Sequence, residues 1–211
     1  MLRIKELYAD DYIVVVEKPG GLLSVPGRGP DKQECVVNQL KAVYPDMIEQ
    51  PSVHRLDMDT SGLMVLARTK EAHRALSIAF QNREVEKEYI ALLDGEVEAE
   101  TGRIILPFRL DPDNRPYQVY DEKYGKVGET VWVKLSSENG RTRILFRPLT
   151  GRTHQLRLHS SHEYGLGAPI VGDRLYGTGT APGQLKLHAS YLKFHHPVTD
   201  KVMEFRSEPP F

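Results

Sequence analysis

The stretch Val53-His54-Arg55-Leu56-Asp57-Met58-Asp59-Thr60-Ser61-Gly62 leads directly into the apolar run Leu63–Ala67. The first part is polar and contains Asp, Ser and Gly, residues that stabilise turns through local hydrogen bonds and permissive dihedral angles. The second part has the length of a strand and is apolar throughout, which indicates a buried strand. The sequence therefore predicts a turn that presents carboxylates and a basic pair at the entrance to a buried strand.

Further helices and strands are predicted on both sides of this turn. Tyr12–Glu17 is rich in β-branched residues and stops at Lys-Pro-Gly-Gly, which indicates a strand that enters a turn. Apolar residues at helical spacing predict one helix from Val36 to about Tyr44 and another around Ala72–Phe80. The alternating segment Val85–Leu93 predicts a further strand.

The second half of the chain is dominated by predicted strands. Thr130–Leu135 and Arg143–Arg147 flank Asn139-Gly140, a dipeptide typical of tight hairpins. The remaining predictions are a long loop over Asp111–Lys126, a helical turn over His154–His162, and strands over Leu185–Phe194 and Val202–Phe205. Strands outnumber helices, so we expect one α+β domain over residues 1–211, with a largely antiparallel mixed β-sheet flanked by helices and loops.

Composition indicates an ordinary globular protein. The chain has 211 residues, of which 40% are hydrophobic and 27% charged. Its longest apolar runs are far shorter than the roughly 20 residues that cross a bilayer, and no apolar run follows Lys5 and Glu6 to predict a signal peptide. The single cysteine, Cys35, cannot form an internal disulfide. Together these features predict a cytoplasmic protein that does not contact membranes.

The charge distribution leaves two interpretations open. The formal net charge is −1, which does not by itself indicate a nucleic-acid binder. However, five arginines and no carboxylate lie between Arg141 and His162, whereas the segment Glu84–Glu100 is strongly acidic. These arginines could form a basic face, or they could be surface strand residues that pair with the acidic segment.

His54-Arg55-Leu56-Asp57, followed by Thr60-Ser61-Gly62, resembles the nucleophile motif of the RluA-type RNA pseudouridine synthases. Similar motifs recur in the family's order, so the resemblance covers nearly the whole chain, from Lys18 to Pro197. These other motifs are Lys18-Pro19-Gly20-Gly21-Leu22, Lys87-Glu88-Tyr89, Gly151-Arg152-Thr153-His154-Gln155-Leu156-Arg157, Gly172-Asp173 with Tyr176-Gly177, and Leu187-His188-Ala189.

The resemblance implies a fold, an activity and a substrate. The fold would be the pseudouridine synthase fold with a central active-site cleft, and the activity would be isomerisation of uridine to pseudouridine in structured RNA. The chain is short, and no separate RNA-binding extension is expected. Together with Ser24-Val25-Pro26-Gly27-Arg28 and Asn114-Arg115-Pro116, this makes it most similar to the dual-specificity members, which act on large-subunit rRNA and tRNA stem-loops. One departure is the run Ser160–Ala168, which is longer than expected and has Ala168 where the family usually has His. Substrate fit near this run therefore stays open.

The resemblance also assigns roles to individual residues. Asp57 would be the catalytic carboxylate, a group suited to glycosidic chemistry. Arg157 would keep Asp57 ionised, and Tyr89 would stack on the uracil and could help to remove the C5 proton. Residues expected to contact RNA, some by filling the stack that a flipped nucleotide vacates and some by binding phosphates, are Arg28, His54, Arg55, Arg115, Arg152, His154 and Gln155.

RNA is the only partner that these motifs imply, and we expect a monomer without an obligate protein partner. The histidines match no zinc-binding spacing and no phosphate-binding glycine loop is present, so neither a metal nor an organic cofactor is expected. Two alternatives stay open. One is an RNA-binding module without catalysis, and the other is a nucleoside or glycoside hydrolase in which Asp59 would act as the second acid.

Overall fold

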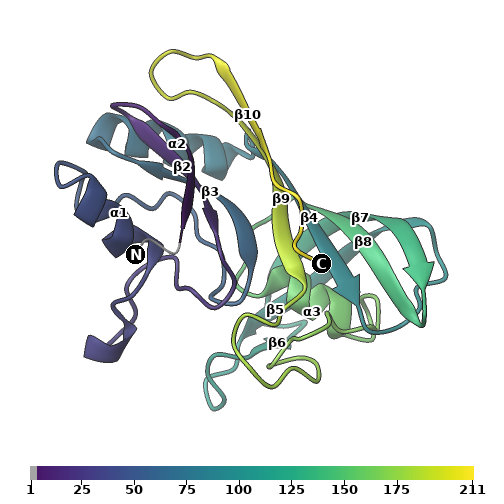
Figure 1. Cartoon of the computed structure of the whole chain (residues 1–211). Coiled ribbons are helices and arrows are strands. Elements are labelled where there is room, and N and C mark those ends of the chain that lie inside the picture. Colours follow the sequence, from purple (N-terminus) through teal and green to yellow (C-terminus); the bar gives the residue numbers. More distant parts are fainter. Residues whose placement is uncertain (1–3) are drawn as a thin grey trace. The chain divides into compact units, whose positions relative to one another are not determined.

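The structure is a computed structural model that describes residues 4–211. The chain divides into two compact units, and each is described by itself. Unit 1 contains the residues up to Lys87 together with His188–Pro210, and unit 2 contains Glu88–Leu187 and Phe211. Figure 1 shows the strands and helices of both units along the chain.

Unit 1 is built on strands in the order β1-β2-β3-β9-β10. Neighbouring strands are antiparallel except β3 and β9, which are parallel. The elements are β1 (Lys5–Ala9), β2 (Ile13–Lys18), the 3-10 turn η1 (Pro30–Lys32), α1 (Val36–Val43), β3 (Ser61–Ala67), α2 (Lys70–Asn82), β9 (Leu187–His195) and β10 (Val202–Arg206).

The local sequence explains why these elements form. Every residue of β3 is buried, as are Ile13–Val16 of β2, which fits their continuous apolar runs. Helix α2 begins where the Thr69 hydroxyl accepts the Ala72 N–H at 3.2 Å, and it ends at Arg83 in the left-handed conformation, with φ of 64°. Its buried residues Ala72 and Leu76 pack in the hydrophobic core of this unit.

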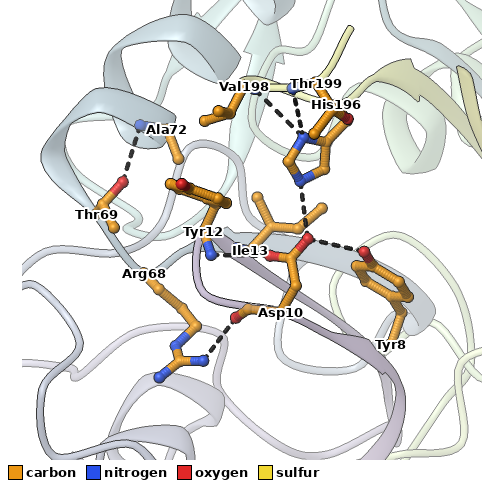
Figure 2. Close-up of polar contacts among 10 residues, drawn as sticks. All are labelled: Tyr8, Asp10, Tyr12, Ile13, Arg68, Thr69, Ala72, His196, Val198 and Thr199. Carbon is orange, nitrogen blue, oxygen red and sulfur yellow. Dashed lines mark hydrogen bonds and ion pairs between the residues drawn. The ribbon is translucent and has the colours of Figure 1, made fainter. Parts of the chain in front are cut away.

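A polar network joins the β1–β2 turn to the β9–β10 turn within unit 1 (Figure 2). The Asp10 carboxylate accepts hydrogen bonds from the Tyr8 hydroxyl at 2.7 Å, the Tyr12 N–H at 2.8 Å and His196 Nε2 at 2.9 Å. His196 Nδ1 accepts the Thr199 N–H at 3.0 Å, so its proton lies on Nε2, facing Asp10. Burial alone would raise the pKa of Asp10, but the Ile13 N–H, which donates to the carboxylate at 2.9 Å, and the other three donors lower it below its usual value.

Unit 2 contains a second antiparallel arrangement, with strands in the order β4-β8-β7-β5-β6 and one helix, α3. The elements are β4 (Glu86–Leu93), β5 (Thr101–Leu110), β6 (Gln118–Tyr120), β7 (Lys126–Glu138), β8 (Arg141–Pro148) and α3 (Gln155–Ser161). Asn139 and Gly140 both have positive φ, 54° and 72°, which matches the tight turn predicted for the β7–β8 hairpin. Leu156 and Leu158 of α3 pack against the apolar face of the strands.

The predicted fold class is confirmed: the protein is α+β, and its strands are mostly antiparallel. The three predicted helices and the predicted strands are present within a few residues of their expected bounds. Strands β1 and β5 were not predicted, because Lys5–Ala9 is half polar and β5 contains Gly102 and Pro107, which weaken a strand pattern. The predicted loop over residues 111–126 contains the three-residue strand β6. Within residues 4–211, no helix combines the length and apolarity needed to span a membrane.

Candidate active site

Asp57 lies in a tightly anchored loop of unit 1, here called the Asp57 loop (residues 54–60). The Thr60 N–H donates to the Asp57 carbonyl at 3.2 Å, which closes the predicted turn. Asp57 is half-buried, whereas Asp59 and Thr60 are buried. The loop therefore presents Asp57 as the more accessible of its two carboxylates.

A buried lysine holds this loop on the segment that follows β2. The Lys18 side chain is fully buried, and its ammonium donates to the carbonyl oxygens of Pro19 at 3.0 Å, Leu22 at 2.7 Å and Met58 at 2.9 Å. The Gly21 N–H also donates to the Met58 carbonyl, at 2.9 Å. A buried charge is tolerated when it is hydrogen-bonded in this way. The Lys-Pro-Gly-Gly motif thus positions the residue next to Asp57.

Two more contacts fix the start of the Asp57 loop. The Ser24 hydroxyl donates to the Leu56 carbonyl at 2.6 Å and accepts the Leu56 N–H at 3.1 Å. The His54 ring stacks on Phe80, with ring centroids 4.6 Å apart, and its Nε2 accepts the Val65 N–H at 3.1 Å. Burial lowers the pKa of His54 to about 3, so the ring is neutral and its proton lies on Nδ1.

The end of the loop is anchored to β9. The Ser61 hydroxyl lies 2.8 Å from His188 Nδ1, and His188 Nε2 lies 2.9 Å from the Ser207 hydroxyl. Gly62 has a φ of 111°, and a Cβ at this position would lie 2.6 Å from the backbone nitrogen of Ala189. Only glycine allows the two strands to approach so closely. The Thr60-Ser61-Gly62 motif is therefore explained by packing against the Leu187-His188-Ala189 motif.

In unit 2 the central feature is a buried ion pair between Arg157 and Asp173. Arg157 Nε donates to Asp173 Oδ2 at 2.8 Å and Arg157 Nη2 donates to Oδ1 at 2.6 Å, a bidentate geometry. The two side chains are 4% and 0% exposed. Asp173 Oδ1 also accepts the backbone N–H groups of Leu175 and Tyr176. Burial would raise the pKa of Asp173, but the hydrogen bonds and the positive charge of Arg157 lower it, so the carboxylate is ionised.

Aromatic and imidazole groups surround this ion pair within unit 2. The Arg157 guanidinium lies 5.3 Å from the centroid of the Tyr176 ring. The Tyr176 hydroxyl accepts the Gln118 N–H at 2.8 Å and lies 2.9 Å from His154 Nδ1. Tyr89, on β4, is half-buried and packs, like Tyr176, against the hydrophobic core of this unit. Tyr89 and Arg157 thus belong to unit 2, whereas Asp57 belongs to unit 1.

Gln155, which was predicted to contact RNA, has a side chain that is hydrogen-bonded within unit 2. Its Nε2 donates to the Glu129 carbonyl and the Thr130 hydroxyl, both at 2.9 Å. Its Oε1 accepts from the Thr150 hydroxyl at 2.7 Å and the Arg152 N–H at 3.1 Å. These four bonds use the full capacity of a carboxamide. Gln155 therefore holds the start of α3 against β7 in this structure.

The other predicted RNA contacts are mostly at the surface: Arg28, Arg55, Arg115 and Arg152 are exposed, and His154 is half-buried with a φ of 56°. The arginine run does not form a uniformly unpaired basic face. Arg141 lies 3.5 Å from Asp94 and Arg147 lies 2.7 Å from Glu88, so these two pair with the acidic segment as the second interpretation predicted. Exposed pairs of this kind contribute little to stability.

The sequence did not reveal the roles of Lys18, Asp173 and Tyr176, although all three belong to motifs that were recognised. A charged residue inside an apolar strand end, such as Lys18, signals a buried group that needs partners. The Gly-Asp-x-x-Tyr-Gly motif similarly contained an unassigned acid, which proves to be the partner of Arg157. Among residues 4–211, no cluster of three or more His, Cys, Asp or Glu residues is arranged to hold a metal ion.

Comparison with known proteins identifies the relatives of this chain. Residues 12–162 match the family model described as RNA pseudouridylate synthase. The chain is 41% identical over 215 residues to "Dual-specificity RNA pseudouridine synthase RluA" of Haemophilus ducreyi, covering 99% of this chain and 94% of the relative. It is also 41% identical over 210 residues to the Escherichia coli K12 protein of the same name, with coverage of 97% and 93%.

A solved structure shows the same fold. "Human RNA Pseudouridylate Synthase Domain Containing 1" matches with a TM-score of 0.76 and 29% identity, over 99% of this chain and 84% of the human chain. The alignments with the two dual-specificity enzymes cover nearly the full length of this chain and of each relative. The family match over residues 12–162 includes the segments that hold Asp57, Tyr89 and Arg157. This chain therefore belongs to the RNA pseudouridylate synthase family.

Proposed function

We propose that this protein isomerises uridine to pseudouridine in structured RNA, with large-subunit rRNA and tRNA stem-loops as its substrates. The support is the match to dual-specificity enzymes over more than nine-tenths of their length. As an isomerase, the protein would break the bond between uracil N1 and the sugar carbon and join uracil C5 to the same carbon. N1 then gains a proton and C5 loses one, so the reaction needs no redox cofactor and no nucleoside triphosphate.

Asp57 is the catalytic carboxylate in this proposal. An Asp carboxylate can serve as a nucleophile or as a stabilising anion when a glycosidic bond breaks. The observation that carries the assignment is the anchoring of the Asp57 loop, because Lys18, Ser24 and Ser61 hold it on both sides. A catalytic group must be held in place before the substrate arrives, and these contacts do so.

Arg157 keeps the Asp57 carboxylate ionised while a base is bound. A guanidinium has five N–H donors and can bind two carboxylates, so the pair with Asp173 is compatible with this role. Asp173 fixes the plane of the guanidinium, and we therefore assign it as a positioning residue.

Tyr89 stacks on the extruded uracil while the base is detached, and its hydroxyl could help to remove the C5 proton. Base flipping costs a few kcal/mol, and stacking on one aromatic ring returns roughly 1–3 kcal/mol. The exposed Arg28, Arg55, Arg115 and Arg152, with His54 and His154, contact the RNA around the target. Because most of these are cationic, binding should weaken steeply as salt concentration rises.

We also propose that the protein works in the cytoplasm as a monomer, without an obligate protein partner, metal or organic cofactor. The support is chemical: the isomerisation is balanced within one nucleotide, and RNA is the only partner that the motifs imply. Retention of activity after treatment with a chelator and gel filtration at the mass of one chain are the expected results.

The decisive experiment compares Asp57→Asn with Asp59→Asn, a matched change two residues away. Asp57→Asn should lower turnover by about 10³-fold or more while RNA affinity stays nearly unchanged, since the lost charge acts mainly in the transition state. Asp59→Asn should retain more activity. Pseudouridine is measured by carbodiimide labelling of the RNA, affinity by gel shift and folding by circular dichroism.

Two outcomes would contradict these assignments. Appreciable turnover by Asp57→Asn would remove Asp57 from the mechanism, and equal loss in both variants would mean that the wrong carboxylate was chosen. Free uracil among the products, in place of RNA of unchanged mass, would favour a hydrolase.

A further inference from the structure

Unit 1 contains a pocket of about 630 Å³ next to the Asp57 loop. This volume lies within the range of roughly 300–1,000 Å³ that is typical of ligand pockets. Helix α1 supplies Asn38 and Lys41 on one side, and the segment Glu49–Arg55 supplies the other. Arg55 precedes Asp57 by only two residues, which span at most about 7 Å of chain. Two of its lining residues, His54 and Arg55, belong to the Asp57 loop, so the pocket borders the loop that carries the proposed nucleophile.

The wall formed by Glu49–Arg55 is held in place by β3. The Ile48 N–H donates to the Arg68 carbonyl at 3.1 Å, and the Ala67 N–H donates to the Pro51 carbonyl at 2.9 Å. His54 Nε2 accepts the Val65 N–H farther along the same strand. Because the wall is bonded to the buried strand β3 at two points, through Pro51 and His54, and the residue before it is bonded just beyond that strand, the pocket is formed before any ligand binds.

The lining combines apolar side chains with oriented polar groups. Val25, Val37 and Val53 offer surfaces against which a flat base can pack. Asn38 Nδ2 donates to the Gln33 carbonyl at 2.7 Å, which leaves its carboxamide oxygen as an acceptor. His54 contributes an N–H donor, because its Nε2 is occupied and its proton is on Nδ1.

The charges in the pocket favour an anion. Lys41 and Arg55 line it, and neither forms an ion pair with any residue of the described range 4–211. Glu49 is the one carboxylate in the lining, and His54 is neutral. Two cations and one anion leave a net positive charge, which attracts phosphate. Apolar walls, polar groups suited to a base edge and a cationic rim together match a nucleotide.

We infer that this pocket binds the nucleotide of the substrate RNA that lies next to the target uridine. The base packs between the valine side chains with its edge toward Asn38 and His54, and the phosphate lies at Lys41 and Arg55. This inference rests on the proposed function, because it assumes that a uridine is extruded toward Asp57. Extruding two adjacent nucleotides would give the enzyme a second base to hold, and therefore a preference for the sequence beside its target.

The first test is an abasic scan of a stem-loop RNA that contains the target uridine. Each flanking nucleotide is replaced in turn by an abasic one, and kcat and KM are measured with the wild-type protein. We expect one flanking position at which kcat/KM falls about tenfold, mainly through KM, as expected for the loss of one contacted base. An unchanged kcat/KM at every flanking position would overturn the inference.

The second test uses the double variant Asn38→Ala with Lys41→Ala, and Lys5→Ala as a matched control on the outer strand β1. The double variant should show the tenfold loss on intact RNA and no further loss on the sensitive abasic RNA. The control should behave like the wild type with both RNAs. If the double variant also loses about tenfold in kcat/KM on the sensitive abasic RNA, the pocket and the base act independently. That result would also overturn the inference.

Failure of the proposed function is distinguishable from failure of this inference. If the wild-type protein forms no pseudouridine in intact RNA, the proposed function is wrong. The affinities of the same intact and abasic RNAs, measured by gel shift with the wild type and the double variant, still decide whether the pocket holds a flanking nucleotide.

Discussion

The Arg157–Asp173 ion pair allows the most direct test of the structure of unit 2. In Asp173→Asn the oxygen that accepts from Arg157 Nη2, Leu175 and Tyr176 can remain, but an amide N–H would face Arg157 Nε. The variant loses a charge-assisted bond and leaves a guanidinium that is 4% exposed without its counter-ion. Breaking a buried pair in this way costs about 3–5 kcal/mol.

Urea unfolding followed by Trp132 fluorescence measures this cost. Trp132 is the only tryptophan of the chain and is buried in unit 2, so it reports on the unit that contains the ion pair. With a urea dependence of ~2–3 kcal/mol per M, we expect the unfolding midpoint to fall by about 1–2 M. The matched control is Asp94→Asn, which breaks the half-exposed pair with Arg141 and should cost under about 1 kcal/mol.

The pH dependence gives the same prediction a second readout. The pKa of Asp173 is lowered in the folded state, so the ion pair stabilises the protein above the unfolded pKa of about 3.9 and loses its effect as pH falls through the lower, folded pKa. The difference between the wild type and Asp173→Asn should therefore be constant from neutral pH to about pH 5 and shrink in stronger acid. If Asp173→Asn costs no more than Asp94→Asn at pH 7, the assignment of a buried, structurally important ion pair is refuted.

Two further predictions concern unit 1. Burial lowers the pKa of His54 to about 3, whereas the unfolded pKa is about 6.5. Between these two values the unfolded state binds more protons than the folded state. The free energy of unfolding of the wild type should therefore fall by on the order of 2 kcal/mol from pH 7 to pH 5. In His54→Gln the free energy of unfolding should depend less on pH over this range. Some dependence remains, because burial also lowers the pKa of His159. An unchanged slope would show that His54 is not held neutral. Gly62→Ala should destabilise the protein by more than ~3 kcal/mol, because the new Cβ would collide with the backbone of Ala189 at positive φ. The control is Gly140→Ala, because Gly140 also has positive φ but an added Cβ there would meet no neighbouring atom. This variant should cost only about 1 kcal/mol of stability. Equal melting temperatures for Gly62→Ala and Gly140→Ala would contradict this account of the β3–β9 approach.

The sequence by itself determined the features that depend on neighbouring residues. Helices α1 and α2 follow from apolar spacing, the β7–β8 hairpin from Asn139-Gly140, and the turn at Asp57 from its local composition. Each of these patterns acts over a few residues, so it can be recognised without knowing the fold. The order of the motifs also sufficed to indicate the family, which the comparisons confirmed.

Only the tertiary structure decided which groups become partners. The ammonium of Lys18 meets the Met58 carbonyl 40 positions along the chain, and Arg157 meets Asp173 after 16. The Gln155 side chain finds its hydrogen-bond partners in β7 and in the loop before α3, although its motif gave no sign of this. Hydrogen-bond partners and burial are set by segments that are distant in sequence, and burial in turn sets the charge state of His54. A linear pattern names the chemical groups, but their surroundings exist only after the chain has folded.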